Sequence, residues 1–180
     1  MANNDDMKYD TIYFYGINDK EYGYMSNFYK CLFVGKIRDN KNFNFFSVEQ
    51  YMMYHKALLM NDYVIGKKIL NAKNSLECKK LGRKVKPWNE ELWKKHRLLI
   101  VYQGVFLKFT QNKNLKDKLL NTGNKNIAEA SKYDKIWGIG ISKNDAIFGK
   151  KWKGKNLLGK ILVNVRNKII EKSQIKIKNI

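Results

Sequence analysis

The sequence predicts an α+β fold: a single compact domain, mostly helical, with a small sheet contributed mainly by the N-terminal third. Short runs rich in aromatic and β-branched residues, separated by glycines, are confined to this first third. Helical spacing of apolar residues dominates the remainder. The 180 residues, 44% of them hydrophobic, suffice for one core, and the single proline and the lack of a Gly/Ser-rich linker argue against a domain break.

The strands are expected at residues 11–15, 32–34 and 43–46. Turn-forming residues separate them, namely Gly16, Gly23, Gly35 and the Asp39-Asn40 pair. The preceding residues 1–10 are mostly polar and are expected to form a flexible N-terminus.

A helix is expected to begin after Ser47, because Ser47-Val-Glu-Gln50 has the form of a capping box in which Gln50 reaches back to the serine. Further helices are expected at residues 62–70, 75–83, 89–109 and 114–120, and a last one is capped by Asn156. Residues 171–180 are expected to form a C-terminal tail.

Composition excludes several classes of protein. No run of about 18 apolar residues exists, so no transmembrane helix is expected, and the polar N-terminus is unlike a signal peptide. Cys31 and Cys78 are interpreted as reduced structural thiols of a cytoplasmic protein. His55 and His96 are isolated, so no metal site is expected, and neither a P-loop nor a Gly-x-Ser-x-Gly motif occurs.

The net charge of +20 raises the question of a nucleic-acid partner. The charge is spread along the chain, and the longest basic block is Lys150-Lys-Trp-Lys-Gly-Lys155. Heavy use of lysine, asparagine and isoleucine is typical of an A/T-rich coding sequence, which favours drift in composition over a dedicated duplex-binding face. An anionic, phosphate-bearing ligand fits both interpretations.

Glu49 is the first candidate for chemistry. It lies in the opening turn of the helix capped by Ser47, where the helix dipole and free amides favour an ionised carboxylate. A surface glutamate at a helix start is common. The junction between the apolar residues 43–46 and this helix nevertheless favours a functional group. On a helical period Glu49 shares a face with Met53 and Lys56 that is distinct from the core stripe.

A second candidate is the segment from Glu129 to Gly140. Asp134 precedes Trp137 by one turn, so its carboxylate is expected beside the indole, while Glu129 is expected to brace or cap the loop. Gly138 and Gly140 would let a ligand approach the backbone, although a single Gly-x-Gly is a weak signal for phosphate binding.

Polar residues elsewhere are weaker candidates. Each is, by itself, more typical of a turn, a cap or a core hydrogen bond than of a ligand contact. They are Asn27 with Phe28, Arg83, Gln111 with Asn112, and Asn156.

Several motifs follow one another along residues 11–170. In the first half they are Ser26-Asn-Phe28, Ser47-Val-Glu-Gln50 with Lys56, and Leu81-Gly-Arg83 with Trp88. In the second half they are Lys108-Phe-Thr-Gln-Asn112, Leu120-Asn-Thr-Gly123, Glu129-Ala-Ser131, Asp134-Lys-Ile-Trp-Gly-Ile-Gly140, Trp152-Lys-Gly-Lys-Asn156, Leu158-Gly159 and Val165-Arg166. In this order they resemble the YbiA-like family, also called NADAR. Two departures are Met25, where the family often has leucine, and the lysine-rich residues 142–151.

The resemblance implies a small α+β fold and hydrolysis of an N-glycosidic bond between ribose and a nucleobase-like group. The implied substrate is a phosphorylated ribosyl compound of the riboflavin-intermediate type. Two alternatives are open: an ADP-ribosyl hydrolase that removes ADP-ribose from modified guanine in nucleic acid, and a non-catalytic module that binds NAD or ADP-ribose. No cofactor is implied. Nucleic acid is a further candidate partner in view of the charge.

The resemblance also suggests roles for individual residues. Glu49 would be the principal catalytic carboxylate, with Asp134 and Glu129 as second and third choices. The positioning groups would be Asn27, Gln111, Asn112 and Asn156. The remaining expected substrate contacts are stacking by Trp88 or Trp137, phosphate binding by Lys56 or Arg83, and contacts from Phe28 and Gly138.

Overall fold

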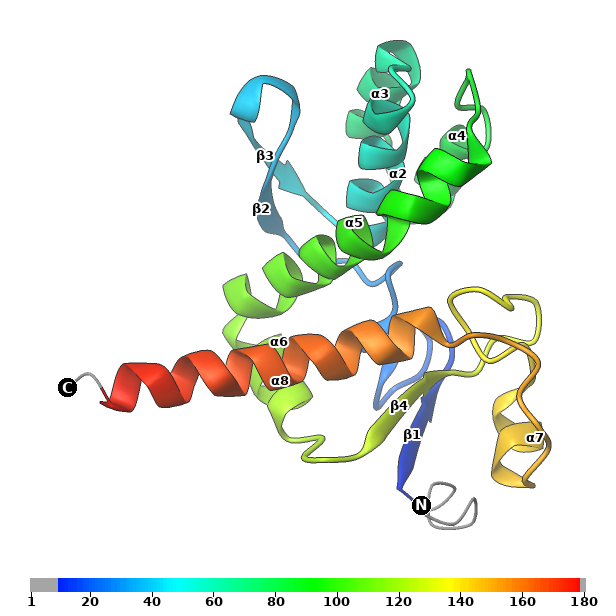
Figure 1. Cartoon of the computed structure of the whole chain (residues 1–180), viewed down its shortest axis with the longest axis vertical. Helices are drawn as coiled ribbons and strands as arrows, with labels where there is room; N and C mark the ends of the chain where they lie inside the picture. The colour runs from blue at the N-terminus through cyan, green and yellow to red at the C-terminus, as the bar shows by residue number, and fades with distance from the viewer. Residues whose placement is uncertain (1–9, 179–180) are drawn as a thin grey trace. The chain divides into compact units, whose positions relative to one another are not determined.

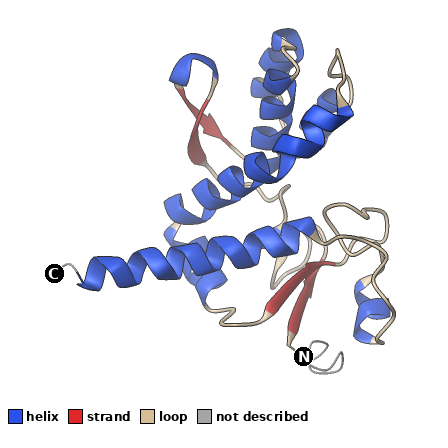
Figure 2. Cartoon of the chain, in the orientation of Figure 1, coloured by secondary structure: helices blue, strands red, loops and turns tan. Residues whose placement is uncertain are grey.

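The computed structural model describes residues 10–178, with side chains to residue 175. By its internal contacts the chain divides into two units: a helical unit, Asn27–Lys113, and a terminal unit formed by Met1–Ser26 and Asn114–Ile180. The fold is α+β with helices predominating, as expected (Figure 2). The expected N-terminus of residues 1–10 lies almost wholly outside the described residues.

The helical unit consists of a hairpin and four helices (Figure 1). Strands β2 and β3 pair in antiparallel fashion and are joined through the predicted Asp39-Asn40 turn, where both residues have positive φ. Helix α2 packs against the other three helices of the unit. The elements are β2 (Phe33–Lys36), β3 (Asn42–Phe45), α2 (Val48–Leu59), α3 (Tyr63–Leu70), α4 (Ser75–Gly82) and α5 (Glu90–Gln111).

Side-chain caps begin these helices at the expected places. Ser47 accepts a hydrogen bond from the Gln50 N–H at 3.1 Å, and Asp62 and Asn89 cap α3 and α5 in the same way. The Gln50 side chain differs from a capping box, because its Oε1 accepts from the Phe46 N–H at 3.0 Å rather than from the serine. Its amide donates to carbonyls at the end of α3, so Gln50 joins two helices.

His55 belongs to a cluster of aromatic rings between α2 and the hairpin. Its ring lies 4.2 Å from that of Tyr51 and 5.2 Å from that of Tyr54, with Phe45 at 6.4 Å. Among the described residues its Nε2 atom has no hydrogen-bond partner. Burial lowers the pKa of His55 from 6.5 to about 4, against a smaller opposing effect of a backbone hydrogen bond with Lys36.

This histidine is expected to make the fold sensitive to acid. Between pH 6.5 and 4 the unfolded state binds more protons than the folded state, so the stabilisation present above pH 6.5 is lost as the pH falls. The loss is expected to be about 3 kcal/mol. Chemical denaturation at neutral and acid pH measures it, and the His55→Phe variant should lose less. Equal losses in the two proteins would contradict this prediction.

The terminal unit contains the second sheet. Strand β1 (Thr11–Phe14) pairs in parallel with β4 (Asn126–Glu129), so Phe14 lies opposite Glu129. The single sheet expected from the N-terminal third is therefore two separate two-stranded sheets among the described residues, and β4 comes from the second half of the chain. The helical elements of this unit are the short η1 (Gly23–Met25), α6 (Lys113–Leu120), α7 (Lys143–Ile147) and α8 (Leu157–Lys178).

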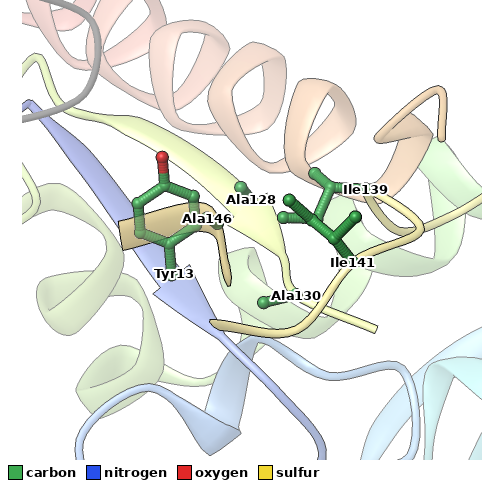
Figure 3. Packing of buried hydrophobic residues seen from close by; sticks show 6 residues of the cluster. All are labelled: Tyr13, Ala128, Ala130, Ile139, Ile141 and Ala146. Atoms are coloured by element: carbon green, nitrogen blue, oxygen red, sulfur yellow. The ribbon is translucent and has the colours of Figure 1, made fainter. Parts of the chain in front are cut away.

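The core of the terminal unit lies around its sheet. Tyr13 from β1 and Ala128 from β4 pack with side chains from the following loop and from α7 (Figure 3). The other members of this cluster are Ala130, Ile139, Ile141 and Ala146.

The buried Arg166 on α8 stabilises the end of the α6 region. It donates to the Thr122 hydroxyl at 2.7 Å and to the Lys125 carbonyl at 2.8 Å. Helix α8 also continues to Lys178, through most of the residues expected to form a tail. None of the described helices combines the length and apolar character that a membrane span requires.

Candidate functional site

Glu49 lies in the first turn of α2 and is buried, with 3% of its surface exposed. Its N–H donates to the Asn27 carbonyl at 2.9 Å, which attaches the segment before β2 to the helix start. Ser75 reinforces this junction, because its hydroxyl lies 2.9 Å from that of Ser47 and 3.2 Å from the Phe28 carbonyl. The prediction of a carboxylate at a strand-to-helix junction is thus confirmed, and its burial distinguishes it from an ordinary surface glutamate.

The Glu49 charge acts on Lys56 of the same helix and on Cys78 of α4. Burial lowers the pKa of Lys56, while the negative charges of Glu90 and Glu49 oppose that shift and Arg83 adds to it. Burial also raises the pKa of Cys78 to about 12, and Glu49 is the largest electrostatic contributor. Both effects place the Glu49 charge close to a cation and to a neutral thiol. The contributions of Cys78 and Glu90 were not foreseen, because only the packing of α4 and α5 on α2 brings them near.

Glu49, Met53 and Lys56 share one face of α2 as predicted, but this face is not distinct from the core, because Glu49 and Met53 are both buried. Met53 packs against Gly82 of α4 so closely that a Cβ there would overlap its sulfur. The Lys56 ammonium donates to the Gly82 carbonyl at 2.8 Å. The absence of a side chain at Gly82 therefore lets α4 approach the carboxylate-bearing face.

Trp88 lies beside this face. The Lys56 ammonium stands 4.2 Å from the centre of its ring, a cation–π distance, and 43% of the Trp88 surface is exposed. Phe28 is half-buried with the Lys79 ammonium 5.4 Å from its ring. Two aromatic rings, each next to a cation, thus occur in the unit that contains Glu49.

Asn27 has unused hydrogen-bonding capacity. It is 6% exposed, and among the described residues its Oδ1 atom has no hydrogen-bond partner. A buried amide oxygen without a partner is costly, so such a group calls for an explanation, of which a ligand is one. The backbone carbonyl of the same residue accepts a hydrogen bond from the Glu49 N–H.

Gln111 and Asn112 have structural partners instead. The Gln111 side chain donates to the Val34 carbonyl and accepts from the Val34 N–H, both at 2.8 Å. Asn112 donates to the Leu32 carbonyl at 3.0 Å. The two amides extend the β2 edge and link it to the end of α5, so we leave them out of the proposed site.

The loop from Glu129 to Gly140 is closed on itself. The Glu129 carbonyl accepts from the Ile139 N–H at 2.9 Å, and Asp134 Oδ1 accepts from the N–H groups of Ile136 and Trp137, both at 2.8 Å. The predicted turn between Asp134 and Trp137 is therefore present, and the carboxylate holds the backbone of that turn. Glu129 ends strand β4 rather than beginning the loop.

Helix α8 begins against this loop. The N–H groups of Asn156, Leu157 and Leu158 donate to loop carbonyls of residues 138, 136 and 137, at 3.1–3.2 Å. These bonds satisfy amides that a side-chain cap would otherwise serve. The prediction that the Asn156 side chain caps the helix is wrong: its amide donates to the Ile127 carbonyl at 2.9 Å and accepts from the Glu129 N–H at 3.1 Å.

The loop glycines are explained by packing within the chain. A Cβ at Gly138 would lie 2.8 Å from the Glu129 carbonyl oxygen, and one at Gly140 would lie 3.0 Å from the Gly154 nitrogen. Gly140 also has φ of 70°. The close approach expected of a ligand at these glycines is made by the chain's own backbone.

The predicted residues thus form two groups, one in each unit. Glu49, Lys56 and Asn27 come together in the helical unit with Arg83 and Trp88 nearby, whereas Glu129, Asp134 and Trp137 share the loop that precedes α8. Among residues 10–178, no three histidine, cysteine or acidic side chains form a group suited to a metal ion.

The NADAR domain family matches residues 13–170. A protein of Acanthamoeba polyphaga mimivirus named as an N-glycosidase is 43% identical, over 86% of this chain and 94% of its own length. A protein of Nostoc punctiforme that is also named as an N-glycosidase is 31% identical, over 88% of this chain and 92% of its own length. A riboflavin biosynthesis protein of Vibrio vulnificus is 30% identical over 89% of this chain but 39% of its own length.

The solved structure of YbiA from Escherichia coli shares the fold. It superposes with a TM-score of 0.72 at 24% identity and covers 91% of this chain and 87% of its own. The resemblance noted in the sequence motifs is confirmed, and the matched family domain includes residues of both units. The chain belongs to the NADAR domain family.

Proposed function

We propose that this protein is an N-glycosidase that hydrolyses the bond between ribose and a nucleobase-like group in a phosphorylated ribosyl substrate. The observation that carries the proposal is the buried Glu49 carboxylate within the field of Lys56, on a residue whose backbone N–H is bonded to the Asn27 carbonyl. Relatives that cover nearly the whole chain are named as N-glycosidases. The riboflavin-related relatives support an aminopyrimidine ribotide as the substrate class.

The chemistry explains why a buried carboxylate is needed. Breaking the bond between C1′ and the base nitrogen develops positive charge on the ribose. A carboxylate held away from water stabilises that charge and takes a proton from the attacking water molecule. We assign both roles to Glu49. The water oxygen bonds to C1′, and the base leaves with the bond's electron pair and gains a proton.

Neighbouring side chains supply the binding contacts. The unpartnered Asn27 oxygen would accept a hydrogen bond from a ribose hydroxyl, and the exposed Trp88 ring would stack on the departing base. Lys56 and Arg83 would bind the phosphate. Asp134 and Glu129 are retained as second and third carboxylates, and Asp134→Asn tests whether the turn residue takes part.

Removal of ADP-ribose from modified guanine in nucleic acid is the alternative reaction of the same bond type. The net charge of +20 supports it, because lysines and arginines would bind the phosphate backbone. Salt separates the two reactions. Turnover of a nucleic-acid substrate falls steeply as salt rises, and turnover of a small ribotide changes much less.

The experiment is a substrate panel incubated with the pure protein and read by chromatography. The panel holds a ribosylaminopyrimidine phosphate, NAD, ADP-ribose and DNA that contains ADP-ribosylated guanine. Release of the free pyrimidine supports the proposal, and release of guanine-containing DNA from ADP-ribose supports the alternative. Binding without a released product would instead indicate a sensor of NAD or ADP-ribose.

Lys56 is expected to act mainly in binding. The Lys56→Gln variant should raise KM about 10-fold with a smaller change in kcat, because a charge-assisted contact to phosphate is lost. Since burial lowers the Lys56 pKa, the wild-type KM should also begin to rise with pH below the ordinary lysine range. Steady-state kinetics measure both effects. Lys80→Gln, at an exposed position of α4, is the control, and an equal effect of the two substitutions would contradict the assignment.

A further inference from the structure

The terminal unit contains a cavity of about 890 Å³ beside β1 and the first turns of α8. Its volume lies within the range of ordinary small-molecule sites. Every lining residue that the structure describes belongs to the terminal unit, and none of them is among the residues grouped with Glu49. Asn156 is part of the lining, but its amide is already bonded to β4 on both sides.

Aromatic rings form part of the wall. Trp152 meets the Tyr13 ring edge to face, with the ring centres 6.3 Å apart and the planes at 82°. Tyr13 is buried and belongs to the packed cluster beside β1 and β4 (Figure 3), which anchors this contact. Trp152 is 38% exposed and Phe148, also in the lining, is 80% exposed. These exposed ring surfaces suit a flat ligand.

The charge of the lining has one sign. Three lysines contribute to it, Lys150, Lys151 and Lys160, and no acidic residue lies among the lining residues that the structure describes. Lys150 is paired with Asp145 at 2.5 Å, which leaves Lys151 and Lys160 as the main source of positive potential. Asn126 and Asn164 add polar groups. Lysines beside exposed rings recognise a ligand that is both anionic and aromatic.

We propose that this cavity is a nucleotide-binding site, in which the base stacks on Trp152 and the phosphate contacts Lys151 and Lys160. The nucleotide has two sources, a free mononucleotide or one residue of a single-stranded nucleic acid. The site goes beyond the proposed reaction because it uses no group assigned to it. The lysines around Trp152 would then have a binding role, whereas the net positive charge as a whole was attributed to drift in composition.

Two probes test the proposal: AMP, measured by calorimetry, and a fluorescein-labelled oligothymidine, measured by anisotropy. At least one should bind the wild-type protein. The paired Lys151→Ala/Lys160→Ala variant and Trp152→Ala should each weaken that binding about 10-fold, in line with the contribution of one stacked base or phosphate contact. Trp152→Phe keeps a ring and should retain most of the affinity. Binding of AMP identifies a free nucleotide. Binding of the oligothymidine alone, with steep salt dependence, identifies a strand.

Matched controls separate this site from the proposed active site. Lys172→Ala removes an exposed lysine about three turns further along α8 and should leave the affinity unchanged. Glu49→Gln should also bind the probes normally while losing hydrolysis, so the two proposals fail independently. The inference is overturned if neither probe binds, or if either the lysine-pair variant or Trp152→Ala binds as tightly as wild type.

Discussion

Replacing Glu49 with glutamine is expected to lower kcat about 10³-fold, because a carboxylate that stabilises the ribosyl cation and activates water is lost. The fold should survive, since the Asn27 carbonyl is bonded by the Glu49 backbone N–H and Ser47 caps α2 without the glutamate side chain. Steady-state kinetics measure the loss, and circular dichroism checks the fold. Cys78 offers a second readout, because removal of the negative charge should lower the pKa of its thiol.

Glu91→Gln is the matched control. Glu91 is an exposed glutamate in the first turn of α5 and pairs with Lys94 at 2.9 Å, so its loss should leave kcat near the wild-type value. A wild-type rate in the Glu49→Gln protein would remove Glu49 from the chemistry. If Asp134→Asn also kept the full rate, the carboxylate mechanism would be wrong.

Replacing Gly159 with alanine is expected to destabilise the protein by about 4 kcal/mol, among the largest effects of a single substitution. Gly159 is buried in the first turn of α8, where a Cβ would overlap the Ile127 carbonyl oxygen of β4 and lie 2.5 Å from the Asn156 amide. The strand backbone cannot move aside, because Asn156 bonds it on both sides of Ala128. Chemical denaturation measures the change in the free energy of unfolding.

Gly66→Ala provides the contrast. A Cβ at Gly66, inside α3, would meet the Tyr54 ring at 3.6 Å, which is ordinary contact. Alanine there should be neutral or stabilise the protein by about 0.5–1 kcal/mol, since glycine is a poor helix former. If Gly159→Ala cost no more than Gly66→Ala, the close packing of α8 on β4 would be refuted.

Helix starts that are fixed by a hydrogen bond between residues close in the sequence were predictable from the sequence. Ser47, Asp62 and Asn89 each accept from an N–H three residues later, a local bond that sequence spacing reveals. Strand β4 was missed because its four residues show no alternation of apolar and polar side chains, and its parallel partner β1 lies far away in the sequence. Tertiary pairing decides such a strand.

The candidate site shows the same division. The place of Glu49 at a helix start followed from the Ser47 motif, but its burial depends on the packing of α4 through Met53 and Gly82. Asn156 has the residue type and position of a helix cap, yet its side chain is bonded to the backbone of β4. Loop carbonyls instead accept from the first N–H groups of α8. Spacing identifies polar groups at element ends, whereas only the packed structure determines which partner each group takes.

The central claim is hydrolysis of the bond between C1′ and the base nitrogen in a phosphorylated ribosyl substrate. Incorporation of labelled oxygen from water tests it most directly. The pure protein is incubated with a ribosylaminopyrimidine phosphate in water labelled with ¹⁸O, and mass spectrometry follows the products. We predict free pyrimidine and ribose phosphate that carries one labelled oxygen at C1′, with both products strongly reduced for Glu49→Gln. Intact substrate after prolonged incubation with folded wild-type protein, or equal product release by the two proteins, would contradict the claim.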